Sequence, residues 1–132
     1  MTATSEARGV EMCRSALDVR HTVEKLVQLL DEHGITLFAR IDFSGDAGRA
    51  GLSMRPEQLL LFGNPKAGTP LMQVEPLTGL DLPLKALVWE DELGTTWVAW
   101  NTPDYIVTRH GLPASAGTAL AGAFGLIRQV LG

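Results

Sequence analysis

Two strand-like segments in the second half of the chain are separated by so short a link that they have to pair side by side. Residues Leu84–Glu90 and Thr95–Asn101 are rich in apolar and aromatic side chains, and Asp91–Gly94 joins them. Parallel strands need a connection of roughly a dozen residues or more, whereas a loop this short is typical of an antiparallel hairpin. The hairpin carries all three tryptophans of the chain: Trp89, Trp97 and Trp100. Cross-strand aromatic pairs stabilise a sheet, so we expect an antiparallel sheet built around this hairpin.

An amphipathic segment, Val19–His33, predicts a helix with well-marked ends. Its apolar residues recur at helical spacing and form one stripe: Val19, Val23, Leu26, Val27 and Leu30. Asp18 is a good N-cap because its side chain can accept from the free N–H groups of the first turn. Gly34 follows the segment, and glycine adopts the left-handed conformation in which helices commonly end.

The remaining segments give an order in which strands and helices do not alternate. We expect strands at Gly9–Leu17, Ile35–Ile41 and Glu57–Phe62, and helical segments at Pro70–Glu75, Pro103–Arg109 and Ala114–Leu131. Thr69 is the expected N-cap before Pro70, and the glycine-rich segment Asp42–Gly51 is expected to be irregular. Regular alternation would favour a doubly wound parallel sheet, so this order predicts an α+β fold instead. We expect two layers, with helices on one face of a mostly antiparallel sheet and the other face either solvated or paired with a second subunit.

Length and charge narrow the class of protein. The 132 residues fit one globular domain, expected over residues 10–132 after a flexible tail at residues 1–9. Eleven Lys and Arg against fifteen Asp and Glu give a net charge of −4. This balance argues against nucleic-acid binding, since a phosphate backbone requires clustered basic side chains. The mean hydropathy of +0.11 is high for a small protein and indicates apolar surface that meets a partner.

The ends of the chain and its cysteine favour a cytoplasmic protein without membrane contact. Residues Met1–Gly9 lack the basic start and apolar run of a secretory signal. Gly111–Ile127 carries no charge, but it is too short and too poor in large apolar side chains for a membrane span, which needs about 20 apolar residues. Cys13 is the only cysteine, so no intramolecular disulfide can form, and we expect it to be a buried, inert thiol.

The common catalytic and metal-binding motifs do not fit this sequence. Gly63 and Gly68 have the spacing of a phosphate-binding loop, but Thr69 stands where that loop needs its lysine. A small anion could still bind the N–H groups after Thr69, with Lys66 nearby, although a tight turn and a capped helix explain the same residues. No metal-ligand spacing links the three histidines, His21, His33 and His110. No GxSxG segment supports a catalytic serine, so the sequence predicts no metal and no cofactor and does not favour an enzyme.

The segment Phe62–Met72, which reads FGNPKAGTPLM, resembles a block of the bacterial and archaeal domain of unknown function 302 family. Further segments agree in the same order along the chain: Thr22–Leu26, Phe38–Asp42, Leu80–Lys85, Val88–Asp91 and Trp97–Tyr105. The resemblance covers residues Val10–Arg109. It implies a TATA-binding-protein-like α+β fold with the order β-α-β4-α, usually assembled as a homodimer, and it implies no assigned reaction.

One position departs from the family pattern. The family typically has a histidine after the aspartate that ends the second strand, and Phe43 stands there in this chain, so no role of that histidine transfers. The matching polar positions are the candidate ligand-binding residues: Asp42, Asn64, Lys66, Thr69, Asp81 and Lys85. Turn chemistry also explains Asn64 and Thr69, and a surface pair with Asp81 is the alternative role of Lys85.

Three functions stay open at this point. The leading hypothesis is a homodimeric small-ligand-binding or accessory protein that takes a small molecule or small anion at Asp42 and Gly63–Thr69 or on its sheet. The second is an enzyme that uses Asp42 with Lys66 or Lys85 as acid and base groups. The third is a module whose apolar face serves only dimerisation. The deciding observation is whether the candidate residues converge on one cavity.

Overall fold

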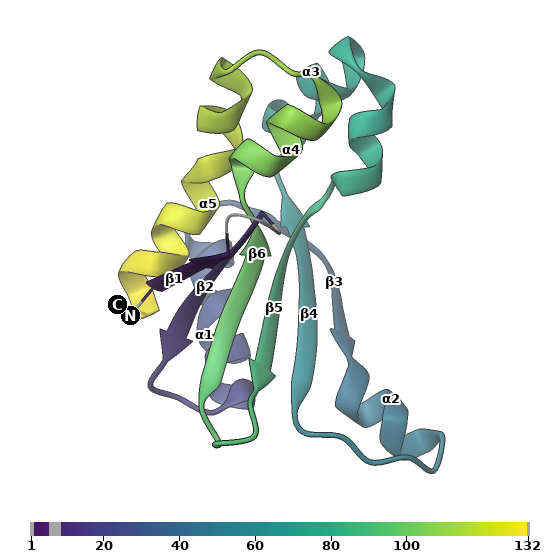
Figure 1. The fold of residues 1–132 in the computed structure, drawn as a ribbon, viewed down its shortest axis with the longest axis vertical. Helices are drawn as coiled ribbons and strands as arrows, with labels where there is room; N and C mark the ends of the chain where they lie inside the picture. Colours follow the sequence, from purple (N-terminus) through teal and green to yellow (C-terminus); the bar gives the residue numbers. More distant parts are fainter. Residues whose placement is uncertain (1, 6–8, 132) are drawn as a thin grey trace.

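The computed structural model describes residues 2–5 and 9–131, and within them six strands form one sheet in the order β1-β2-β6-β5-β4-β3 (Figure 1). The strands span Thr2–Ser5 (β1), Val10–Ser15 (β2), Thr36–Asp42 (β3), Glu57–Gly63 (β4), Leu84–Glu90 (β5) and Thr96–Asn101 (β6). Every neighbouring pair is antiparallel. The predicted hairpin is confirmed, because β5 and β6 pair with Trp89 opposite Trp97. Asp91 holds its turn by accepting the N–H groups of Leu93 and Thr95, each at 2.9 Å.

One face of the sheet carries the core beneath two long helices, α1 (Val19–Glu32) and α5 (Ser115–Leu131). Successive strand residues point to opposite faces, and on the helix side Leu60, Val88 and Val98 are completely buried. Figure 1 shows α1 behind the central strands. The expected α+β architecture, with helices packed on a mostly antiparallel sheet, is therefore confirmed.

Aromatic contacts fix α5 against the sheet. The Phe124 ring stacks on Trp100 of β6, with ring centroids 5.1 Å apart, and meets the edge of Phe62 of β4 at 5.9 Å. Such pairs add to the stabilisation that area burial alone provides. Phe124 therefore anchors the glycine-containing helix to two strands, β4 and β6.

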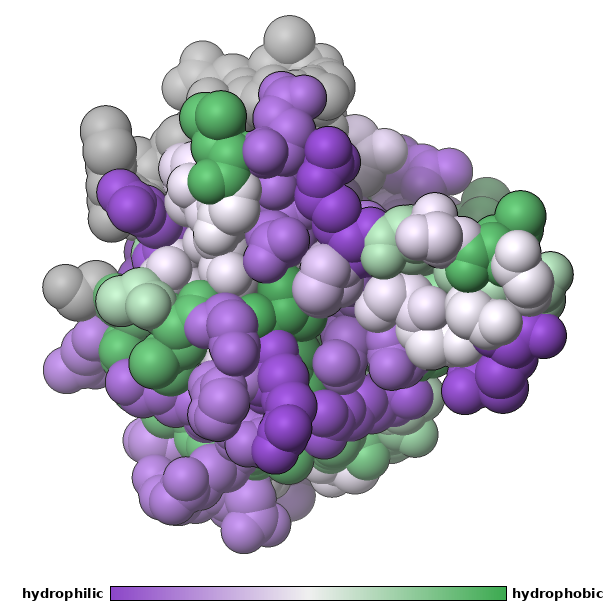
Figure 2. All heavy atoms as spheres, turned by 90° about the horizontal axis from the view of Figure 1, so that it is seen from below, coloured by the Kyte–Doolittle hydropathy of each residue, from purple (hydrophilic) through white to green (hydrophobic). Residues whose placement is uncertain are grey.

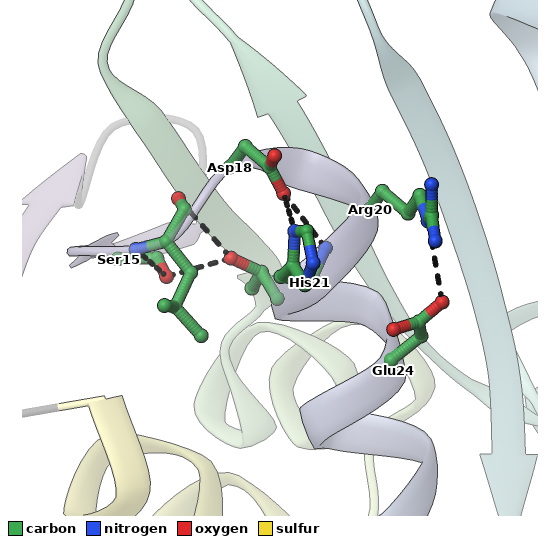
Figure 3. A network of polar contacts seen from close by, with 7 residues as sticks. Ser15, Asp18, Arg20, His21 and Glu24 are labelled. Carbon is green, nitrogen blue, oxygen red and sulfur yellow. Dashed lines mark hydrogen bonds and ion pairs between the residues drawn. The ribbon is translucent and has the colours of Figure 1, made fainter.

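The start of α1 is held by a small polar network (Figure 3). Asp18 Oδ1 accepts the N–H of His21 at 2.8 Å and lies 2.7 Å from the Nδ1 of the same histidine. The backbone N–H and then the side chain of His21 lower the pKa of Asp18 from its ordinary value. The hydroxyls of Ser15 and Thr22 share a buried hydrogen bond of 2.7 Å. Asp18 is the N-cap that the sequence predicts, and Gly34 follows the helix with φ of 65°.

The opposite face of the sheet carries no helix among the described residues (Figure 1). Register places Leu59, Leu87 and Ala99 side by side across β4, β5 and β6 on this face, and Trp89 lies opposite Trp97 beside them. We call it the open face. The centre of the open face is apolar.

Shorter helices lie at the two ends of the sheet (Figure 1). At the end where β4 stops are α3 (Pro65–Val74), the 3₁₀ helix η2 (Pro76–Asp81) and α4 (Pro103–His110), while α2 (Phe43–Arg49) projects from the other end. Figure 2 looks at the α2 end, where green and pale side chains lie beside polar ones. The exposed large apolar residues of this part of the chain are Phe43, Leu52 and Met54.

The prediction of an irregular segment at Asp42–Gly51 is wrong, because α2 is stabilised at both of its ends. Asp42 Oδ1 accepts the N–H of Gly45 at 3.0 Å and caps the first turn. Ser44 Oγ accepts the N–H of Glu57 at 3.2 Å and thereby ties the helix to the start of β4. Gly51, with φ of 78°, follows the helix in the left-handed conformation. These contacts offset the low helix propensity of glycine.

Two further predictions differ from the structure. Helix α3 begins at Pro65 rather than Pro70, because Asn64 rather than Thr69 is its N-cap and accepts the N–H of Lys66 at 2.9 Å. Part of the expected flexible tail, Thr2–Ser5, is strand β1, which pairs with the otherwise free edge of β2. Residues 1 and 6–8 of that expected tail lie outside the described residues.

Candidate functional site

A groove of about 870 Å³ opens at the end of the sheet where β4 stops. Phe62 and Leu84, at the adjoining ends of β4 and β5, contribute to its lining, and α3 and α5 flank it. We call it the α3–α5 groove. Most of its other side chains are apolar or small, among them Ile35, Met72, Leu82, Ala123 and Leu126. A largely apolar cavity of this size is typical of small-molecule sites.

Small residues on α5 keep one side of the groove open. Ala119, Gly122 and Ala123 line it, and their spacing of three and four residues places them on one face of the helix. A Cβ atom built on Gly122 would meet no atom within 4 Å. The groove at this point is therefore free space rather than packed core.

A β-bulge brings an aromatic ring to the groove. Leu37 pairs with Phe62, but the next pairing joins Ala39 to Leu61, so Phe38 is the extra residue on β3. A bulge changes the direction of the side chain that it inserts. Phe38 lines the groove and keeps 53% of its surface exposed, while its ring would lie 3.6 Å from a Cβ built on Gly63. Bulges are common next to binding sites, which makes Phe38 a candidate ligand contact.

Three polar side chains line the groove: His33, Asn64 and Thr69. His33 Nδ1 lies 2.9 Å from the carbonyl oxygen of Leu29, so Nδ1 carries the proton and donates it. Nε2 is then left for a ligand. Asn64 Oδ1 accepts from the N–H of Lys66, which identifies the other atom of its amide as the NH₂ donor. No protein acceptor among the described residues takes that NH₂ group.

Two of the predicted site residues thus lie in the groove, and a third is next to it. Asn64 and Thr69 contribute to the lining. Lys66 does not, but it is exposed on the first turn of α3 between Pro65 and Ala67, both of which do. The FGNPKAGTPLM block therefore supplies one wall of a cavity.

Asp42 lies at the opposite end of the sheet. It pairs in register with Gln58, so the remaining length of β4 separates it from the groove by roughly 17 Å at about 3.4 Å per residue. The N–H of Gly45 and the hydroxyl of Ser44 hold the pKa of Asp42 below its ordinary value of 3.8. Both groups belong to α2 and its cap, so the carboxylate is used in capping the helix.

Asp81 is buried and already paired. Its carboxylate lies 2.5 Å from His110 Nε2 and accepts from Arg109 Nη1 at 3.0 and 3.2 Å. The side chains of Asp81 and His110 are only 10% and 5% exposed. The expected surface pair with Lys85 is therefore wrong, because Asp81 instead joins η2 to α4.

The enzyme hypothesis required groups that the fold keeps apart. Lys85 pairs with Leu61 and Asp42 with Gln58, and since Leu61 and Gln58 lie an odd number of residues apart on β4, Lys85 and Asp42 face opposite sides of the sheet. Lys66 lies beyond the far end of β4. The structure does not bring an acid and base pair together from these residues.

Other chemistries find little support in the described part of the chain. Asp18 and His21 lie near Ser15, but the Ser15 hydroxyl is buried and bonds to Thr22, so the three do not form a catalytic triad. Within residues 2–5 and 9–131, no group of three or more His, Cys, Asp or Glu side chains is arranged to hold a metal ion. No helix of those residues is long and apolar enough to cross a membrane.

Sequence reasoning missed His33, Phe38 and Gly122. His33 has no partner at a recognisable spacing, and the bulge at Phe38 depends on the register of β3 against β4. Small-residue spacing on the last helix is visible in the sequence, but only the packing of α5 shows which of its faces borders a cavity. Position 43, where the family usually has histidine, carries Phe43 at the α2 end, away from this groove.

A solved structure of another protein has the same fold. A crystal structure of an uncharacterized conserved protein DUF302 from Bacillus stearothermophilus matches with a TM-score of 0.77 at 19% sequence identity. The match covers 93% of this chain and 95% of that one. At this identity the likeness shows a shared fold.

Two curated relatives have names that refer to an ion channel. Proteins named fluoride-specific ion channel FluC 1 from Brucella suis biovar 1 and Brucella abortus biovar 1 are each 38% identical to this chain over 112 residues. These matches cover 85% of this chain but only 44% and 42% of the relatives, so the chain spans less than half of their length. The family model for the domain of unknown function DUF302 matches residues 12–129, which is nearly the whole chain. The chain therefore belongs to the DUF302 family.

Proposed function

We propose that this chain is a cytoplasmic, homodimeric small-ligand-binding or accessory protein, and that its ligand occupies the α3–α5 groove. The observation that carries the proposal is the groove itself. It is largely apolar, and a few polar groups from separate segments, among them His33 and Asn64, border it. Small-molecule sites commonly combine these features, because apolar walls supply affinity and isolated polar groups orient the ligand.

Binding rather than catalysis is the function that the groove supports. A general acid or base has to lie within hydrogen-bond reach of the reacting group, and the residues of the enzyme hypothesis, Asp42, Lys66 and Lys85, do not line the groove. Asp42 is used as a helix cap, and Asp81 is paired with Arg109 and with the buried His110. The polar side chains that do line the groove are suited to holding a ligand in place.

The proposed dimer uses the open face of the sheet. Leu87 lies at its centre, between Leu59 and Ala99 on the neighbouring strands, and covering this face with a second copy would remove its apolar surface from water. Light scattering of the wild type and of Leu87→Lys tests this. We expect a dimer at micromolar concentration for the wild type and a monomer for the variant, and a monomeric wild type contradicts the proposal.

The accessory role is favoured by the Brucella relatives. Their names refer to fluoride-specific ion channels, and more than half of each relative lies outside the segment that this chain matches. Since no described helix here could cross a membrane, we expect the membrane-crossing part of those relatives to lie in their remaining length. Deleting the matched segment from the Brucella suis protein should leave fluoride flux into vesicles measurable. Complete loss of flux from a correctly inserted deletion variant would contradict an accessory role.

A thermal-shift screen with two phenylalanine variants tests ligand binding in the groove. Phe38 of β3 lines the groove, while Phe43 is partly exposed at the start of α2, directly after the far end of β3, which makes Phe43→Ala a matched control. Compounds that raise the Tm of the wild type and of Phe43→Ala should lose most of this effect on Phe38→Ala. If every stabilising compound acts equally on Phe38→Ala, the ligand site lies elsewhere.

A further inference from the structure

We infer that the α3–α5 groove takes an elongated apolar molecule with a single carboxylate head. This inference rests on the proposed ligand-binding function and names the chemical class of the ligand. Three features carry it: the apolar walls, the set of polar groups that border them, and the end of the groove at which those groups lie.

The walls fit an apolar body. Met72 of α3 and Leu126 of α5 line the groove together with Phe38 and the small residues of α5. Apolar surface of a ligand is removed from water when it lies against such side chains, and this is the main source of affinity for an uncharged body. A highly polar ligand would instead lose its hydration without gaining hydrogen bonds along these walls.

The polar groups favour an anionic head. None of the residues that line the groove is Asp or Glu, so a cationic head would find no carboxylate there. The lining does offer two donors, the NH₂ group of Asn64 and the hydroxyl of Thr69. Lys66 adds a positive charge at the exposed first turn of α3. Glu32, the neighbour of His33 in the chain, is not among the lining residues and accepts from Gln28 at 3.1 Å on the exposed side of α1.

The head has a defined place in the groove. Thr36 of β3 pairs with Gly63 of β4, so His33, which precedes that pair, and Asn64, which follows it, lie at the same end of the sheet. Both groups come with their protein partners already assigned, since His33 Nδ1 bonds to Leu29 and Asn64 Oδ1 to Lys66. What they present to a ligand is the NH₂ donor of Asn64 and, from His33, an Nε2 atom that accepts a hydrogen bond, so the carboxylate is held by Asn64 rather than by His33. A carboxylate placed here can accept from the Asn64 amide while its chain extends along α5.

Two glycines of α5 allow the body of the ligand to be tested. Gly122 lines the groove and Gly125 does not, yet a Cβ built on either one meets no atom within 4 Å. A leucine side chain at either position therefore starts in open space and raises helix propensity, but only Gly122→Leu extends into the groove. With decanoate as the probe, measured by isothermal titration calorimetry, Gly122→Leu should weaken binding at least about tenfold. Gly125→Leu should bind like the wild type.

A change at Asn64 tests the head. Asn64→Asp keeps an N-cap oxygen for the N–H of Lys66, since Asp and Asn cap helices equally well, but it replaces the NH₂ donor by a negative charge. Decanoate binding should fall about tenfold or more in Asn64→Asp, while binding of decanol, which is uncharged, should change much less. Decyltrimethylammonium should bind the wild type more weakly than either.

The outcomes separate the ligand class from the function. If decanol or the cation binds the wild type as tightly as decanoate and Gly122→Leu blocks it, the groove binds ligands but the carboxylate inference is wrong. If decanoate binds equally to Gly122→Leu and Gly125→Leu, the ligand does not lie in the groove, and both proposals fall. If decanoate does not bind the wild type but another compound does and Gly122→Leu blocks it, only the carboxylate inference is overturned.

Discussion

The two ends of the β3–β4 pair begin a helix in the same way but differ in what surrounds it. At one end Asp42 caps α2 by accepting the N–H of Gly45, and at the other end Asn64 caps α3 by accepting the N–H of Lys66. Both caps belong to segments that resemble the family pattern. Only Asn64 lines a cavity.

The difference comes from distant parts of the chain. Helix α2 buries no residue, whereas α3 buries Leu71 and lies near α5 and η2. The Asp42 carboxylate accepts hydrogen bonds from Ser44 and Gly45. Asn64, in contrast, has an NH₂ group without a partner among the described residues, and this group lies beside the walls of the groove. A helix cap therefore becomes part of a site only where another element closes a cavity around it.

The largest expected contrast between the two ends concerns their ion pairs. Asp81, at the groove end, is buried against Arg109 and His110, whereas Asp46 and Arg49 of α2 form an exposed pair. Asp81→Ala leaves the buried His110 without its partner and should lower the free energy of unfolding by about 3 kcal/mol. Asp46→Ala should lower it by less than about 1 kcal/mol. Urea denaturation measures both values. Equal effects would mean that the contacts of Asp81 with Arg109 and His110 do not stabilise the groove end of the fold.

A smaller effect is expected from removing the two caps. Asn64→Ala and Asp42→Ala each take away a side chain that accepts from the first turn of a helix, so each should cost about 1 kcal/mol of unfolding free energy. The two variants should differ in decanoate binding, which Asn64→Ala weakens and Asp42→Ala leaves unchanged. Calorimetry on both proteins checks this, and a loss of binding in Asp42→Ala would show that the two ends are coupled.

The same contrast explains which parts of the fold the sequence predicts. The hairpin with Trp89 and Trp97, and α1 between Asp18 and Gly34, follow from patterns contained within one short segment. The sequence does not predict that α2 is a helix, because the stability of α2 depends on a hydrogen bond between Ser44 and Glu57 on the next strand. The start of α3 is ambiguous in sequence, since Asn64-Pro65 and Thr69-Pro70 satisfy the same capping rule.

The candidate site is less predictable than the fold, for a physical reason. Asn64 and Thr69 could be singled out because they belong to one continuous block, but His33, Phe38 and Gly122 come from three other elements. Their proximity depends on the register of β3 against β4 and on the packing of α5 through Phe124. Neither is encoded in the spacing of residues along the chain. The family resemblance places Asp42 in the same candidate site as Asn64, but the length of β4 separates Asp42 from the groove.

The smallest predicted effect is the pH dependence that a charged cap gives to the α2 end alone. The N–H of Gly45 and the hydroxyl of Ser44 lower the pKa of Asp42 in the folded chain below 3.8. Because the folded pKa is lower than the unfolded one, the charge stabilises the fold above about pH 4, and this contribution is lost as the pH falls through the folded pKa.

Asp42→Asn keeps the capping oxygen without the charge, so the wild type should be slightly more stable than this variant at pH 5, and the difference should vanish in more acidic solution. Asn64 does not titrate, so Asn64→Ala should differ from the wild type by an amount that changes little over the same range. Urea denaturation of the three proteins between about pH 5 and pH 2 measures these differences. A gap between wild type and Asp42→Asn that stays constant or widens on acidification would show that the Asp42 charge does not stabilise α2.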